Sequence, residues 1–77
     1  MKQKTIEQVK DDLAHNLKRI RLDRGLAQER LALESEVDRT VVSKIERAVT
    51  NPSLDVLLRL ANRLDVELAD LLATKVE

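Results

Sequence analysis

Residues 28–47, QERLALESEVDRTVVSKIER, constrain the fold of this 77-residue chain more than any other stretch. The small side chain of Ala32 allows two helices to approach closely, and the apolar residues that follow are spaced to meet it where the helices cross. Those residues are Val37, Val42 and Ile45. The pattern therefore predicts two short helices joined by a tight turn, a helix-turn-helix.

The outward face of the second helix carries hydrogen-bond donors rather than a mixture of acidic and basic groups. Donors on such a face can reach base edges and phosphates when the helix lies in a major groove of DNA. At the start of the first helix, Gln28 either holds a phosphate together with nearby backbone N–H groups or is an ordinary exposed residue. A basic cluster precedes the motif and serves either phosphate contact or a solvated face; it consists of Lys18, Arg19, Arg21 and Arg24. The candidate DNA contacts are Gln28, Arg39, Thr40, Ser43, Lys44, Arg47 and, from the basic cluster, Arg19.

Four residues near the helix ends refine this prediction. Ala27 occupies an N-cap position but has no side-chain oxygen, so the first helix begins without the usual cap. Glu36 falls where a turn usually needs a glycine with positive φ. Asp38 is a good N-cap for the second helix, although its carboxylate can also accept a hydrogen bond from a cytosine amino group. Glu46 is expected to form an internal ion pair or hydrogen bond rather than to touch anionic DNA.

The segments on both sides of the motif are also predicted to be helical. Thr5 and Gln8 form a capping-box pattern that starts a helix, and Gly25 ends it in a left-handed C-cap. After an Asn-Pro break, Ser53 caps a further helix, and a short last helix ends near Ala73. The apolar stripe of the first helix consists of Ile6, Val9, Leu13, Leu17 and Ile20.

The leucines of the last two helices exceed what one small core can cover. A domain of this size is marginally stable alone, so burial of leucines in a dimer is plausible. The candidates for a dimer interface are Leu57, Leu68, Leu71 and Leu72, and the alternative is that all four belong to the core.

The composition argues against several classes of protein. The chain has no cysteine, which excludes disulfides and thiolate metal sites and fits a reducing cytoplasm. His15 alone does not build a metal site. Without a glycine-rich phosphate loop or a cleft-forming second domain, we expect no enzyme activity, no cofactor and no small-molecule ligand. The apolar runs are too short for a membrane span, and the first residues have no signal-peptide core.

The net charge is zero, but the charges are unevenly distributed. Residues 1–24 contain seven basic and four acidic residues, whereas residues 51–77 contain three and five. Weak overall basicity favours specific binding by a dimer over loose coating of nucleic acid.

Three segments resemble the lambda repressor and Cro-like helix-turn-helix regulators, also called the Xre family. They are KRIRLDRGLAQERLA (18–32), VSKIERAVTNPSLDVLLRLANRLDV (42–66) and ELADLL (67–72). Within this family, SEVDRTVVSKIER is most similar to the controller proteins of restriction–modification systems, which also commonly have Asp-Arg-Thr at the start of the recognition helix. The chain departs from the family pattern at Ala27, where Ser or Thr is usual, and at Glu36 and Ala48, where glycine is usual. It departs from controller proteins at Val41, where an aromatic residue is common.

The resemblance implies an all-α, five-helix, lambda-repressor-like domain, which we place at residues 5–73, with flexible ends at 1–4 and 74–77. It also implies a homodimer through the C-terminal helices that binds pseudo-palindromic operators in double-stranded DNA. For a controller protein it implies activation and repression of its own promoter and activation of the endonuclease gene. The family's phosphate-contacting glutamine falls on Gln28, and its base-reading positions fall on the second helix, at Arg39, Thr40, Ser43 and Lys44.

Two other functions suit the same fold. The chain could be an antitoxin-type module that binds a toxin partner and autoregulates its operon, because the family includes such proteins. It could also be a structural helical oligomer, although Arg39, Thr40 and Lys44 would then have no role.

Overall fold

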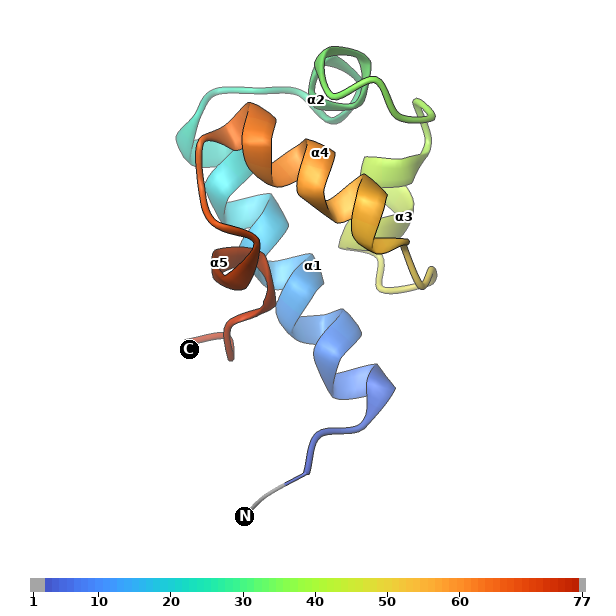
Figure 1. Cartoon of the computed structure of the whole chain (residues 1–77), viewed down its shortest axis with the longest axis vertical. Helices are drawn as coiled ribbons and strands as arrows, with labels where there is room; N and C mark the ends of the chain where they lie inside the picture. Colours follow the sequence, from blue (N-terminus) through green and yellow to red (C-terminus); the bar gives the residue numbers. More distant parts are fainter. Residues whose placement is uncertain (1–2, 77) are drawn as a thin grey trace.

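The computed structural model describes residues 3–76, and every regular element in that range is an α-helix (Figure 1). This confirms the predicted all-α fold with five helices. Among the described residues, no helix combines the length and apolar character that a membrane crossing requires. The helices are α1 (Ile6–Asp23), α2 (Gln28–Glu34), α3 (Val41–Glu46), α4 (Leu54–Leu64) and α5 (Leu68–Leu72).

The longest helix, α1, packs against α3 and α5, while its N-terminal turns extend past the other helices (Figure 1). Its start confirms the predicted capping box, since the Thr5 hydroxyl accepts from the Gln8 N–H and the Gln8 side chain accepts from the Thr5 N–H. The predicted apolar stripe is wrong at its beginning. Ile6 remains 47% exposed because no helix covers the first turn, and full burial begins only at Leu13.

One aliphatic core lies between the helices, and all five contribute to it. Ala32 and Val42 are completely buried and Ile45 nearly so, which confirms the predicted crossing of the two motif helices. The core residues are Leu13, Leu17, Ile20, Leu31, Ala32, Val42, Ile45, Leu57, Leu60, Ala61, Leu64 and Leu71.

Helices α1 to α4 end in the same hydrogen-bonded motif. A residue just after each helix has positive φ, and the next N–H returns to a carbonyl five residues earlier. This Schellman arrangement satisfies carbonyls that the helix end leaves free. At α1 the left-handed residue is Gly25, as predicted, whereas Glu36, Ala48 and Asp65 occupy the other three positions, each with φ of 58°. A Cβ makes this conformation costly by about 1 kcal/mol, so three of the four ends are strained.

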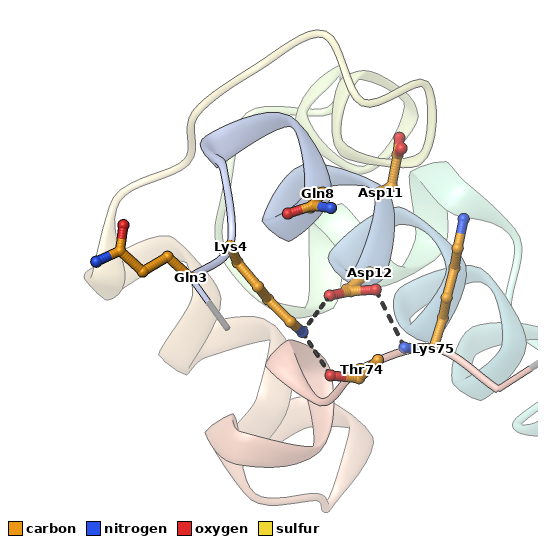
Figure 2. A pocket seen from close by; sticks show the side chains of 7 residues that line it. All are labelled: Gln3, Lys4, Gln8, Asp11, Asp12, Thr74 and Lys75. Carbon is orange, nitrogen blue, oxygen red and sulfur yellow. Dashed lines mark hydrogen bonds and ion pairs between the residues drawn. The ribbon is translucent and has the colours of Figure 1, made fainter. Parts of the chain in front are cut away.

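Described residues near the two ends of the chain meet on α1 (Figure 2). The Lys4 ammonium donates to the Asp12 carboxylate at 2.6 Å and to the Thr74 hydroxyl at 2.5 Å. The backbone N–H of Lys75 donates to the same carboxylate at 3.1 Å. We call these four residues the end clasp. One turn further along α1, the buried Asn16 side chain donates to two carbonyls at the end of α5, at 3.0 and 2.7 Å.

Three of the four clasp residues, Lys4, Thr74 and Lys75, fall within the segments that the sequence predicts to be flexible. Residues 1–2 and 77 of those segments lie outside the described residues. Among the described residues of those segments, Lys4, Thr74 and Lys75 are held against α1 by these contacts.

Candidate nucleic-acid interface

A single hollow on the surface lies where α2 begins and α3 runs beside it. Six of the seven predicted DNA-contacting residues line it, together with Glu29. Four of the six are exposed, and Gln28 and Ser43 are half-buried. The hollow therefore offers three cations, one hydroxyl and an amide to an approaching ligand, from Arg39, Lys44, Arg47, Ser43 and Gln28, and Thr40 also lines it.

The inner face of α3 determines which side chains point outward. Val42 and Ile45 are buried, and helical spacing then turns Ser43, Lys44 and Arg47 toward the hollow. α3 begins at Val41, two residues later than the sequence predicts.

The later start of α3 moves two predicted recognition residues into the turn before it. Arg39 and Thr40 lie in that turn, which is closed by a hydrogen bond from the Val41 N–H to the Asp38 carbonyl at 3.0 Å. The Asp38 carboxylate accepts from the Thr40 N–H at 2.8 Å, within the turn. The prediction that Asp38 is the N-cap of α3 is wrong, because Thr40 holds that position and no side chain caps the helix. The Thr40 hydroxyl, followed by the Thr40 N–H, lowers the pKa of Asp38 below its ordinary value.

A buried ion pair joins the end of α3 to α1. The Arg21 guanidinium donates to both carboxylate oxygens of Glu46, at 2.7 and 2.9 Å, and to the Leu26 carbonyl at 2.8 Å. The side chains of Arg21 and Glu46 are only 8% and 5% exposed. The internal pairing predicted for Glu46 is thus confirmed, but the sequence analysis did not identify Arg21 as its partner. The available signal was spacing, since Arg21 follows the buried Leu17 by four residues.

The same ion pair holds Gln28. Its amide nitrogen donates to a Glu46 carboxylate oxygen at 3.0 Å, the oxygen that also accepts from Arg21. The amide group is thereby fixed at the rim of the hollow, with its second N–H free of this contact. This geometry suits the predicted phosphate contact.

Arg19 does not belong to this group of side chains. It is exposed, but it does not line the hollow. Two residues along a helix correspond to roughly 160° around its axis, so Arg19 lies on the opposite side of α1 from Arg21, which faces α3. The sequence pattern could not separate the two arginines because both belong to one basic cluster.

The predicted dimer-interface leucines also need correction. Leu57 and Leu71 are 5% and 0% exposed and fill the core of their own chain, which leaves them no surface for a partner. Leu68 and Leu72 are half-buried against that core. The apolar groups that α4 does expose are Leu54 and Leu58, 70% and 48% exposed, which were not among the predicted interface residues.

Comparison with known proteins identifies the motif. The Helix-turn-helix family model matches residues 17–71, which include all of the hollow. Control protein C.BamHI of Bacillus amyloliquefaciens is 40% identical over 57 residues, which cover 73% of this chain and 70% of that protein.

Solved structures agree with this match. The restriction-modification controller protein C.AhdI from Aeromonas hydrophila superposes with a TM-score of 0.77 at 39% identity and covers 80% of this chain and 94% of its own. The hypothetical transcription factor NHTF from Neisseria superposes with a TM-score of 0.84 at 31% identity and covers 96% of this chain and 85% of its own. The chain has the lambda-repressor-like fold and belongs to the Helix-turn-helix family of DNA-binding transcriptional regulators.

Proposed function

We propose that this chain binds pseudo-palindromic operators as a homodimer and acts as a controller protein of a restriction–modification system. The observation that carries operator binding is the convergence of three cations, one hydroxyl and an amide on one hollow at α2 and α3. The controller role rests on the similarity to C.BamHI and C.AhdI, both named as controller proteins.

Five side chains of the hollow have chemical roles in this proposal. The Arg39 guanidinium pairs with the two acceptors of a guanine edge, the commonest specific contact in major grooves. Ser43 and Lys44 reach neighbouring bases one turn further along. Arg47 and Gln28, both near the end of α3, bind backbone phosphates and set the position of α3 in the groove.

A second copy of the chain covers the exposed face of α4. Leu54 and Leu58 are four residues apart and therefore lie side by side on that face, where they form an apolar surface for self-association. A two-fold symmetric pair would place two α3 helices in successive major grooves, about 34–36 Å apart. That spacing is what a pseudo-palindromic operator requires.

The test is fluorescence-anisotropy binding of the full chain to the DNA directly upstream of its own gene, in a salt series. Arg39→Ala should weaken binding by about 1–3 kcal/mol and relax the preference at one base position in each half-site. Arg19→Ala is the control, because it also removes one positive charge but at a residue that does not line the hollow. This variant should leave the base preference intact. Equal, weak binding by wild type and Arg39→Ala, with no sequence preference in a random pool, would refute the proposal.

A further inference from the structure

The hydroxyl group of Thr40 is already bound within the protein. A single carboxylate oxygen of Asp38 accepts both the Thr40 hydroxyl, at 2.5 Å, and the Thr40 backbone N–H, at 2.8 Å. An oxygen has two lone pairs for such donors, and a hydroxyl has only one hydrogen to give. Thr40 therefore cannot donate to a base without breaking its contact with Asp38.

This contact also fixes the side chain of Thr40. The side-chain torsion of Thr40 is already restricted because the residue is β-branched. The hydrogen bonds from its backbone N–H and its hydroxyl to the same Asp38 oxygen fix that torsion further. Thr40 lines the hollow, whereas Asp38 does not. With its hydroxyl turned to Asp38, the group that Thr40 can offer to a ligand in the hollow is its methyl.

The four bases differ in what they offer to a methyl group in the major groove. Guanine presents two acceptors, which the bound hydroxyl cannot serve and the adjacent Asp38 carboxylate would repel. Thymine alone presents a methyl group of its own.

We propose that Thr40 reads one thymine methyl in each half-site and that Asp38 is the positioning residue that turns the Thr40 methyl toward it. The inference rests on the proposed binding of operator DNA and deepens it, because it names one base of the operator. A lone pair of the Thr40 hydroxyl could instead accept from the amino group of adenine or cytosine, and the test separates these outcomes.

The experiment begins with selection of a preferred half-site from random duplexes by the wild-type chain. Each thymine of that site is then replaced singly by deoxyuracil, which keeps base pairing and removes only the 5-methyl group. We expect one replacement per half-site to weaken binding about fourfold, the factor that corresponds to about 0.8 kcal/mol for one buried methyl.

Four variants assign that effect to its residues. Thr40→Ser keeps the hydroxyl and loses the methyl, so it should bind the thymine and deoxyuracil sites equally. Thr40→Val keeps a methyl in place and should retain the fourfold ratio. Asp38→Ala releases the Thr40 side chain and should reduce the ratio, whereas Asp38→Asn keeps an acceptor oxygen and should restore it. A purely structural role of Asp38 would change affinity for both sites alike and leave the ratio unchanged.

Several results would overturn the inference. A preferred half-site whose thymines all tolerate deoxyuracil, or a Thr40→Ser variant that keeps the ratio, would refute methyl reading while leaving operator binding established. A preference for adenine or cytosine that is lost in Thr40→Val would show that Thr40 acts as an acceptor. A wild-type chain that selects no sequence would refute both this inference and the proposed function.

Discussion

At the scale of single residues, the chain places side chains at three positions where the backbone is left-handed, among the described residues. Ala48 has φ of 58° directly after α3, a position that the family usually fills with glycine. Ala48→Gly should therefore raise the free energy of unfolding by about 1 kcal/mol, since relief of the Cβ strain exceeds the added entropy of the unfolded chain. Urea denaturation measures the change.

The matched control is an alanine with helical backbone. Ala14 is half-buried in α1, as Ala48 is in its loop, and Ala14→Gly should lower stability by about 0.5–1 kcal/mol. If both glycine variants lose stability to the same extent, Ala48 is not strained. The sequence identified Glu36 and Ala48 as departures from a glycine pattern, but only backbone torsions show that the chain keeps the glycine-like conformation at both.

At the scale of elements, the position of α3 depends on the ion pair between Arg21 and Glu46. In Arg21→Met, the Glu46 carboxylate, which is only 5% exposed, would lose its guanidinium partner. This loss should lower the free energy of unfolding by about 3–5 kcal/mol. The double variant Arg21→Met/Glu46→Leu should recover much of that loss because no unpaired charge remains buried. Arg30→Met, which breaks a surface pair with Glu34, should change stability by less than about 1 kcal/mol. A loss in Arg21→Met as small as that in Arg30→Met would contradict this role.

Sequence patterns predicted the ends of several helices correctly, but not which face of α4 is buried. Capping residues such as Thr5, Gly25 and Ser53 marked helix ends correctly because a cap depends on a few neighbouring atoms. In α4 the prediction named Leu57 for the dimer interface and not Leu54 or Leu58, because the sequence pattern alone does not separate the leucines on the two faces of this helix. Leu57 and Leu58 are adjacent in sequence, yet one is 5% and the other 48% exposed. Only the packing of α4 against its neighbours decides which of them is core.

At the scale of the whole molecule, self-association through α4 predicts a monomeric variant. Leu54→Lys/Leu58→Lys should shift the sedimentation coefficient to that of one chain, because two added charges oppose each other across a two-fold interface. The change should also weaken binding to a full operator far more than binding to an isolated half-site. Leu22→Lys, at a residue of α1 that is 57% exposed, is the control and should sediment like the wild type. A double variant that sediments like the wild type would place the dimer interface elsewhere.

The end clasp makes the stability of the whole molecule depend on one carboxylate. The Lys4 ammonium, followed by the Lys75 N–H, holds the pKa of Asp12 below its ordinary value (Figure 2). A carboxyl whose pKa is lower in the folded state stabilises the fold above its unfolded pKa of about 3.9, and this contribution disappears as the pH falls through the folded pKa. Asp12→Asn should therefore be less stable than the wild type at pH 7, and the difference should shrink below about pH 4.

Urea midpoints of Asp12→Asn and of the wild type between pH 7 and pH 2 measure this difference in stability. Asp11→Asn makes the same charge change at an exposed carboxylate that points away from the clasp, and it should show no such convergence (Figure 2). A difference between Asp12→Asn and wild type that stays constant down to pH 2 would mean that the ionised carboxylate does not hold the two ends.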